Sequence, residues 1–381
     1  MADLSGRRPR LLHLHSSFQL GGKEARAVRL MNHMGDRASH TIISGDPEAM
    51  SARDAIDPGV KVDFPHDAPL LTGLPGLTRY RVLARYMAQF DLVLTYNWGA
   101  MDGVMARRTF APFRALPRLI HHEDGFNADE KDGLKAKRNL FRRAALRTAH
   151  ALVVPSITLE GISRRIWGQP ARRVRLIPNG IAVERYGETP APDAIPALRR
   201  TPGKLLVGTL AGLRPVKNIP RLVEAVAAHR DRLQLVVVGE GPERDAIIAT
   251  AQAVGLDDLC LAGFLPDPSR YVGLFDIFAL SSDSEQFPIS LVEAMAAGLP
   301  VVSTNVGDVA HMVAPENQRF VVADGEGLAR ALGTLADDGD LRARLGAANR
   351  ARAVRDFAED AMLDAYARLY GEALASPSIL R

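Results

Sequence analysis

The chain of 381 residues lacks several features that would assign it to a class at once. Cys260 is its only cysteine, so no intrachain disulfide can form and a cytoplasmic location is the simplest expectation. No apolar run exceeds the length of a strand, as in LQLVVVG at 233–239, whereas a membrane-spanning helix needs about 20 apolar residues. The N-terminal segment has basic side chains but no long apolar run, which predicts a tail rather than a signal peptide.

The low aromatic content and the lack of a metal-binding pattern exclude two classes of function. Aromatic residues make up only 6% of the chain and no RNA- or DNA-binding motif is recognisable, so we expect no nucleic-acid partner. The histidines show no zinc-binding spacing. The Asp-Gly-Asp triplet at 338–340 matches the Asp-x-Asp pattern of Mg²⁺ sites, but its place in a predicted helix–helix turn favours a helix cap. We therefore expect a protein that needs neither a metal ion nor a resident cofactor.

Charge is distributed unevenly along the chain, although the net charge is only +4. Residues 1–185 hold 29 Lys and Arg against 18 Asp and Glu, which is +11, and the rest of the chain is −7. The basic first half favours an acidic or membrane-borne partner, and the acidic second half favours a different one.

Strand-like apolar segments alternate with helical ones along the chain, which predicts an α/β protein with parallel sheets joined by right-handed crossovers. The segment 186–203 holds four Pro and two Gly and is interpreted as a linker. We predict two facing Rossmann-like domains, at 1–185 and 204–356, with the active site in the cleft between them, because ligands bind at the carboxyl ends of parallel strands. The remaining residues, 357–381, are predicted to form a helix that packs back on the first domain.

The segment EQFPISLVE carries two carboxylates eight positions apart, Glu285 and Glu293. Ser290 and Glu293 fit a capping box for a short helix at about 291–297, which places Glu285 in the loop before that helix. Each carboxylate taken alone is more often a capping or solvated side chain. The loop follows an apolar strand, however, and a helix N-terminus favours phosphate. Because carboxylates bind sugar hydroxyls well, the pattern indicates a nucleotide-sugar site.

The same segment resembles the E-x7-E motif of retaining glycosyltransferases of family GT4, which have the GT-B fold. Further segments resemble that family in the same order along most of the chain, which is far more specific than E-x7-E alone. They are LGGKE at 20–24, VRLIPNGI at 174–181, LRPVKN at 213–218, VVVGEGPERDAI at 236–247 and LAGFLPDPSRYVGLFDIFALSS at 261–282.

The resemblance implies how the donor is held. Glu293 would bind the ribose hydroxyls, and Glu285 would bind the donor sugar. Arg214 and Lys217 would bind the diphosphate and stabilise the leaving group, so no metal is needed and no protein nucleophile is assigned. The other residues implied at the donor site are Gly22, which would face the donor phosphate, Phe264 near the base, Phe287, Pro288 and Ile289.

Two histidines end the predicted strand RLIHH, at a place where the family usually has a histidine near the transfer centre. Strand alternation points His121 and His122 to opposite faces. We assign His122 to the catalytic site, with the other histidine in the core, and Asp124 is the alternative for this position. Gln286 and Pro288 depart from the glycines that are common in the family, which affects the expected contacts to the donor sugar.

The segment 134–147, LKAKRNLFRRAALR, holds six cations with apolar residues between them. A basic amphipathic helix of this kind can lie on an anionic membrane surface. The alternative is a core-packed helix with a solvated basic face, and the sequence leaves both open. The first alternative would make the protein peripheral at the inner face of the membrane.

The predicted function is transfer of a sugar from a nucleoside diphosphate sugar to a glycan, a lipid-linked sugar or a lipid, with retention at the anomeric carbon. By resemblance, the first domain binds the acceptor and the second binds the donor. One alternative is a nucleotide-sugar epimerase of similar fold, which would convert the donor without an acceptor. Another is a non-catalytic scaffold that binds sugar or membrane.

Overall fold

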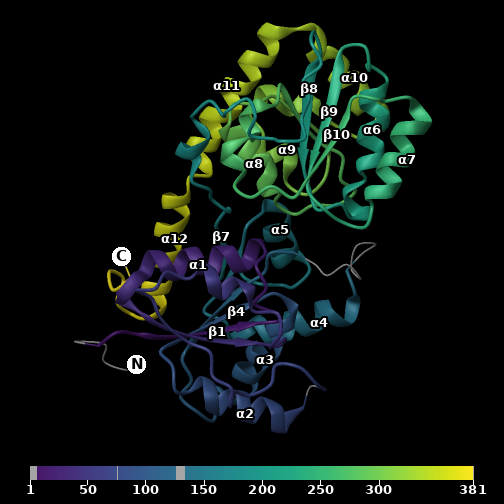
Figure 1. The fold of residues 1–381 in the computed structure, drawn as a ribbon. Coiled ribbons are helices and arrows are strands. Elements are labelled where there is room, and N and C mark those ends of the chain that lie inside the picture. The colour runs from purple at the N-terminus through teal and green to yellow at the C-terminus, as the bar shows by residue number, and fades with distance from the viewer. Residues whose placement is uncertain (1–6, 75, 126–133, 381) are drawn as a thin grey trace. The chain divides into compact units, whose positions relative to one another are not determined.

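The computed structural model describes residues 7–74, 76–125 and 134–380. The chain divides into two compact units (Figure 1). The first unit is formed by Met1–Pro178 together with Asp360–Arg381, and the second by Asn179–Glu359. The division therefore falls after Pro178, whereas the sequence analysis placed it after residue 185. The C-terminal segment belongs to the first unit, as predicted.

Within the described residues, the first unit is built on a seven-stranded sheet in the order β3-β2-β1-β4-β5-β6-β7, and all its paired strands are parallel. The strands are β1 (Arg10–His15), β2 (Ser39–Ser44), β3 (Lys61–Asp63), β4 (Leu92–Tyr96), β5 (Arg118–His122), β6 (Ala151–Val154) and β7 (Val174–Leu176). Its helices are α1 (Gly22–Met34), α2 (Leu77–Met87), α3 (Met101–Phe110), α4 (Ala136–Ala145), α5 (Ile157–Arg165) and α12 (Glu359–Ala373).

Two apolar clusters cover the two faces of this first sheet. Helices α1 and α12 share one cluster with inward-facing strand residues, and they lie side by side in Figure 1. Helices α2, α3 and α5 contribute to the cluster on the other face. The helix that ends the chain is thus part of the core of the first unit.

The second unit has, in the part that is described, a six-stranded sheet in the order β10-β9-β8-β11-β12-β13, again with parallel pairs. The strands are β8 (Leu205–Leu210), β9 (Leu233–Val238), β10 (Leu259–Gly263), β11 (Ile277–Leu280), β12 (Val301–Thr304) and β13 (Val321–Val322). Its helices are α6 (Ile219–Ala227), α7 (Arg244–Val254), α8 (Ile289–Ala296), α9 (Val309–Met312), α10 (Gly325–Asp337) and α11 (Gly339–Asp356). Two Rossmann-like units with parallel sheets confirm the predicted fold class.

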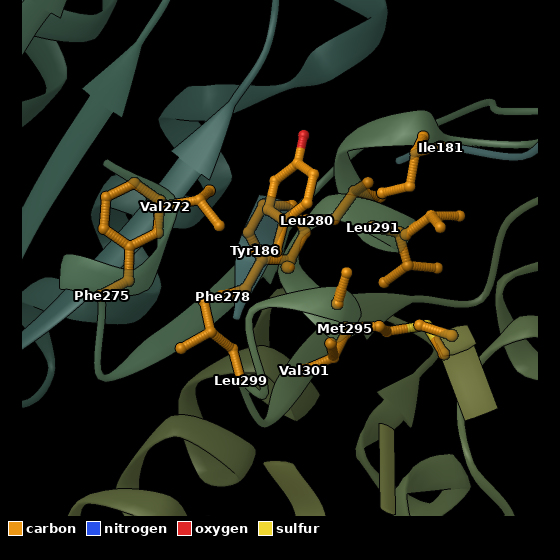
Figure 2. Packing of buried hydrophobic residues seen from close by; sticks show 14 of the residues in the cluster. Ile181, Tyr186, Val272, Phe275, Phe278, Leu280, Leu291, Met295, Leu299 and Val301 are labelled. Atoms are coloured by element: carbon orange, nitrogen blue, oxygen red, sulfur yellow. The ribbon is translucent and has the colours of Figure 1, made fainter. Parts of the chain in front are cut away.

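The segment 186–203, predicted to be a linker, packs against the second unit. Tyr186 and Ile195 are buried in the cluster that contains α8 and β11. Figure 2 shows Tyr186 beside Phe278 and Leu291, with its hydroxyl at the edge of the cluster. The high Pro and Gly content correctly indicated irregular backbone, but it carries no information about whether isolated apolar side chains find a core.

Candidate active site

Glu285 lies in the loop that follows β11, at the carboxyl end of the second sheet. Its side chain is only 11% exposed. Its Oε1 atom accepts hydrogen bonds from Ser282 Oγ at 2.7 Å and from Lys217 Nζ at 2.5 Å. Glu285 is therefore held in a fixed position by two donors, and the alternative of a freely solvated loop carboxylate does not apply.

The loop that carries Lys217 follows β8, the strand next to β11, and is bonded to the Glu285 loop. Ser281 Oγ donates to the Lys217 carbonyl at 3.0 Å, and the Asp283 N–H donates to the Val216 carbonyl at 2.8 Å. The sequence analysis predicted that Lys217 and Glu285 share a site, and the structure brings them into contact. Neither Asp283 nor Ser281 was singled out from the sequence.

Two residues at the start of α6 reinforce this arrangement. Arg221 donates to Asp283 Oδ1 at 2.7 Å and to the Ser281 carbonyl at 3.0 Å. Asn218 adopts a left-handed conformation with φ of 43° and caps α6 through its side chain, a conformation that Asn tolerates better than most residues. The sequence shows Asn218 directly after the predicted R-x-x-K segment, which is the signal that could have located the cap.

Arg214 stands at the entrance to the short 3₁₀ turn Pro215–Lys217, and its side chain is exposed. Within the described residues, its guanidinium makes no hydrogen bond or ion pair. The structure thus places one of the two predicted diphosphate-binding cations in a fixed pair and leaves the other with its donors directed to solvent.

The loop after β12 supports the Glu285 loop from behind. Gly307 has φ of 53°, and a Cβ atom there would lie 2.5 Å from the Glu285 carbonyl oxygen. The Asp308 N–H donates to the Gln286 carbonyl at 3.3 Å. Any side chain at position 307 would displace the backbone that carries Glu285, so the close approach requires glycine.

Gln286 is a site residue that the sequence analysis noted only as a departure from the family. Its Oε1 atom is buried and has no hydrogen-bond partner among the described residues. A buried amide oxygen normally accepts a hydrogen bond. This atom, one residue from Glu285, is therefore an acceptor that the described part of the chain leaves unsatisfied.

The capping box predicted for Ser290 and Glu293 is wrong. Helix α8 begins at Ile289, its N-cap is Pro288, and no side chain caps it. Pro288 has φ of −69°, which suits entry into a helix, so the helix starts earlier than predicted and Ser290 lies inside the first turn. Gly298 adopts φ of 75° after the helix, as expected for a C′ glycine.

Glu293 instead has a partner from a distant part of the sequence. The Tyr186 hydroxyl donates to Glu293 Oε1 at 3.2 Å. Burial, and then the neighbouring Glu293 carboxylate, raises the pKa of the Tyr186 hydroxyl, so that it remains a donor at neutral pH. Tyr186 is another residue that sequence reasoning missed, because it lies in the segment predicted to be a linker.

The remaining predicted donor residues of the second unit have different surroundings. Phe287 packs edge to face on Phe357, with ring centroids 5.6 Å apart. Pro288 is buried and Ile289 is partly buried against the same core. Phe264 is a highly exposed residue directly after β10. Phe287, Pro288 and Ile289 thus support the loop and helix, whereas Phe264 presents its ring to solvent.

In the first unit, Gly22 is the first residue of α1, and a Cβ atom on it would meet no other atom within 4 Å. The chain's own packing therefore does not require glycine at this position. Nearby, Lys23 Nζ lies 2.9 Å from Glu24 Oε1, and Glu24 is buried. Burial raises the pKa of the Glu24 carboxyl despite the Lys23 charge.

His122, the predicted catalytic histidine, is fully enclosed in the first unit. Its Nδ1 atom lies 3.1 Å from the Thr95 carbonyl and its Nε2 atom lies 2.8 Å from the Tyr370 hydroxyl. Nδ1–H therefore donates to the carbonyl, and Nε2 accepts from Tyr370. Burial, and then the charge of Arg26, lowers the pKa of His122 to about 3. These are the surroundings of a satisfied core histidine and disfavour a catalytic role.

The other two candidates at this strand end also have defined partners. His121 Nδ1 lies 2.8 Å from Thr95 Oγ1, and the ring is buried. Asp124 is partly exposed and receives two hydrogen bonds from Arg26, one of them at 2.8 Å. Burial raises the pKa of the Asp124 carboxyl, but the Arg26 charge outweighs it and the net shift is downward. Asp124 is thus the ionised and more accessible of the three.

The basic helix predicted at 134–147 corresponds to α4, and part of it belongs to the core. Arg142 is buried, donates to Glu123 Oε2 at 3.1 Å, and lies over the rings of Trp98 and Trp167 at 5.0 Å each. Leu146 is also buried, whereas Leu140 is exposed. This packing favours the alternative of a core helix with a solvated basic face.

One further expectation can be compared with the structure. Asp338 caps α11 by accepting a hydrogen bond from the Leu341 N–H at 2.8 Å, which confirms the predicted cap. Over residues 7–74, 76–125 and 134–380, no group of three or more His, Cys, Asp or Glu side chains is arranged to hold a metal ion. None of the helices in the described part of the chain combines the length and apolar character needed to cross a bilayer.

Two family descriptions match consecutive parts of the chain. Residues 20–185 match Glycosyltransferase Family 4, and residues 192–352 match Glycosyl transferases group 1. Among curated relatives, the D-inositol 3-phosphate glycosyltransferase of Streptomyces scabiei is 29% identical over 310 residues, which is 75% of this chain and 68% of the relative.

Other relatives match over shorter lengths. The lipopolysaccharide core biosynthesis glycosyltransferase LpsE of Rhizobium meliloti is 34% identical over 156 residues, which is 40% of this chain and 46% of LpsE. The O-antigen chain mannosyltransferase C of Escherichia coli is 30% identical over 188 residues, which is 47% of this chain and 50% of that relative. In these two matches the chain spans about half the length of the relative.

Solved structures agree with the fold. The structure of HepE from Anabaena in complex with UDP and glucose has a TM-score of 0.76 and 19% identity, covering 96% of this chain and 100% of that chain. The structure of WaaG, a glycosyltransferase involved in lipopolysaccharide biosynthesis, has a TM-score of 0.68 and 19% identity, covering 95% and 100%. Together with the consecutive family matches, the two parallel-sheet units show that this chain belongs to glycosyltransferase family 4, with the GT-B fold.

Proposed function

We propose that the protein transfers a sugar from a nucleoside diphosphate sugar to an acceptor, with retention at the anomeric carbon. The observation that carries the proposal is the Lys217–Glu285 pair at the carboxyl ends of the adjacent strands β8 and β11. Membership of family 4 supports it. The second unit would bind the donor and the first unit the acceptor.

In this proposal Lys217 and Arg214 bind the diphosphate. A Lys ammonium has three donors, so the bond to Glu285 leaves two for phosphate oxygens. Arg214, whose side chain is exposed, offers a fork that fits two phosphate oxygens. Both cations stabilise the negative charge that develops on the leaving diphosphate, and they supply positive charge that a metal ion would otherwise supply.

Glu285 and Gln286 would hold the donor sugar. Both hydrogen bonds to Glu285 engage Oε1, so Oε2 is the atom proposed to accept from a sugar hydroxyl. The buried Oε1 atom of Gln286 is a second acceptor in the same loop. In the proposed reaction the acceptor attacks from the face that the diphosphate leaves, and the leaving phosphate takes the acceptor proton, so no protein nucleophile is invoked.

Glu293 would bind the ribose hydroxyls with the carboxylate that Tyr186 orients. For the acceptor we infer a glycan or a glycolipid at the inner face of a membrane. The names of relatives support this, since they include lipopolysaccharide core and O-antigen chain enzymes. The net charge of +11 on residues 1–185 agrees with an anionic acceptor or membrane surface beside the first unit.

The test is a thermal-shift screen of the full chain against UDP-, GDP- and ADP-sugars in the presence of EDTA. A cognate donor at about 100 times its dissociation constant should raise the free energy of unfolding by roughly 2.7 kcal/mol. The stabilising donor is then incubated with and without an acceptor extract, and nucleoside diphosphate release is measured. Donor conversion without acceptor would identify an epimerase, and binding without any turnover would identify a scaffold.

Glu293→Gln is expected to weaken donor binding while leaving the fold intact. The Gln carbonyl oxygen still accepts from Tyr186, but the ribose loses a hydrogen bond to a charged group, which contributes about 1.5–3 kcal/mol. The donor dissociation constant should therefore rise about 10- to 100-fold. Tyr271→Phe is the matched control, because the Tyr271 hydroxyl lies in the same region and donates instead to the Leu265 carbonyl. Unchanged donor affinity in Glu293→Gln would make Glu293 a purely structural residue.

A further inference from the structure

The loop before α2 and the first turn of that helix expose large apolar side chains. Leu70, Leu74 and Leu77 are exposed to 73%, 92% and 69%, and Val82 on α2 is exposed as well. Single exposed leucines are ordinary, but several within one short segment indicate a surface that contacts something. Leu74 in particular is almost completely exposed.

These side chains are not needed for the core of the first unit. Helix α2 packs inward with Tyr80, Leu83, Ala84 and Met87, all of which are buried. Leu71 is buried as well and fixes the loop from the inside. The exposed leucines therefore lie on the side of the segment that the core does not use.

Positive charge accompanies the leucines. Arg81 and Arg85 are exposed on α2, and the helix contains no acidic residue. Within the described residues, neither arginine has a carboxylate partner. Arg79, by contrast, is turned to the protein and pairs with Asp102 at 2.9 Å. The outer side of this segment thus combines aliphatic side chains with two guanidinium groups whose donors are directed to solvent.

We propose that this surface, made of Leu70, Leu74, Leu77, Arg81, Val82 and Arg85 and called the leucine–arginine surface, docks on an anionic lipid bilayer. Leucines that project from the surface insert at the boundary of headgroups and acyl chains, while the arginines bind lipid phosphates. A protein partner would favour the aromatic anchors typical of interface hot spots, which this surface lacks. The inference rests on the proposed function, because it supplies the means by which a membrane-borne acceptor is reached.

The assignment differs from the one predicted from the sequence. Helix α4 is also basic, but Arg142 and, directly after the helix, Leu146 are buried, and Leu140 is the large apolar side chain it exposes in the part of the chain that the structure describes. The leucine–arginine surface has its apolar and cationic groups on the outside together. Membrane contact is therefore placed at α2 and the loop before it.

The test is co-sedimentation of the full chain with vesicles of phosphatidylcholine alone or mixed with phosphatidylglycerol. We expect binding to the anionic vesicles only. A triple Leu70→Ser, Leu74→Ser, Leu77→Ser variant should lose at least about 10-fold in partitioning, because its side chains no longer insert at the boundary of headgroups and acyl chains. An Arg81→Gln, Arg85→Gln variant should lose about 30-fold, because each cation near an anionic surface contributes about 1 kcal/mol.

Controls separate the alternatives. Leu140→Ser on α4 and Val354→Ser on α11 remove apolar side chains that are 69% and 50% exposed, and both should bind vesicles as the unmodified protein does. Loss of binding in Leu140→Ser, or full binding in the triple variant, would overturn the proposal. Self-association of the unmodified protein that the triple variant abolishes would assign the surface to a second copy and also overturn it. The donor-induced thermal shift, measured on the same variants, should stay unchanged. A loss of vesicle binding can therefore be distinguished from a loss of donor binding.

Discussion

Replacement of Lys217 by methionine is expected to lower turnover of the cognate donor about 10²- to 10³-fold, the usual effect of removing one group that stabilises transition-state charge. Methionine keeps an unbranched side chain but removes the ammonium group that contacts Glu285 Oε1 at 2.5 Å. The charge on the leaving diphosphate then has Arg214 alone to stabilise it. The measurement is nucleoside diphosphate release in single-turnover conditions, with donor binding followed in parallel.

The loss must be distinguished from damage to the fold, because Lys217→Met leaves the Glu285 carboxylate nearly buried without its cation. The double variant Lys217→Met, Glu285→Gln removes that uncompensated charge, so its thermal midpoint should recover while its turnover stays low. Lys204→Met is the matched control: Lys204 forms a 2.5 Å pair with Asp258 in the same unit, before β8 rather than after it. Equal turnover losses in the Lys204 and Lys217 variants would contradict a role of Lys217 in the reaction.

The two-unit fold could be predicted because its signal is repeated along the sequence. Most strands of both sheets read as short apolar segments between helical or polar ones, and parallel pairing follows from the crossovers. The Lys217–Glu285 contact could also be predicted, since both residues follow strands and the carboxyl ends of neighbouring parallel strands lie together. Nothing in that reasoning depends on which side chain of a distant segment fills a given space.

The predicted capping box was wrong because Glu293 has a partner from a distant segment. Ser290 and Glu293 have the spacing that a cap requires, but Pro288 already suits helix entry and the helix starts there. Glu293 accepts a hydrogen bond from Tyr186, which is 107 positions away in the sequence. A local rule describes only local partners, and here a tertiary hydrogen bond replaces the local one.

His122 shows the same limit in the first unit. Alternation along β5 correctly separates His121 from His122, but it does not say which face another element covers. Tyr366 and Tyr370 of α12, from the end of the chain, lie against the His122 ring. Assigning His122 required knowing where α12 packs within the first unit, which the apolar pattern of α12 alone does not specify.

Mild acid is expected to unfold the first unit before the second. Burial lowers the pKa of His13 and His15 far below the usual value, that of His40 to about 4 and that of His122 to about 3. All four are neutral in the folded state near neutral pH. Three of them, His13, His40 and His122, form hydrogen bonds with other buried side chains. His13 Nε2 lies 3.0 Å from His40 Nδ1, and His122 Nε2 lies 2.8 Å from the Tyr370 hydroxyl.

The direction of the pH effect on the free energy of unfolding follows from the pH at which the folded and the unfolded chain take up protons. Above about pH 6.5, the ordinary histidine pKa, both the folded and the unfolded chain hold these rings neutral and the free energy of unfolding does not depend on them. Below it, the unfolded chain binds protons that the folded chain does not, down to about pH 4, which is the pKa of His40 in the folded state. Each histidine then lowers the free energy of unfolding by about 1.4 kcal/mol per pH unit.

Together the four histidines lower it by about 5 kcal/mol per pH unit, and domains have only about 5–15 kcal/mol in total. The first unit should therefore unfold between about pH 5.5 and pH 4. Hydrogen exchange resolved by segment can compare its protection with that of the second unit.

His15→Leu should reduce the pH slope of the free energy of unfolding by about a quarter, because the ring nitrogens of His15 have no hydrogen-bond partner among the described residues and its loss removes only a titrating group. His311→Gln, at an exposed position on α9, should leave the slope unchanged. Loss of protection at the same pH in both units, or a slope that His15→Leu does not alter, would show that these buried rings do not govern the acid stability of the first unit.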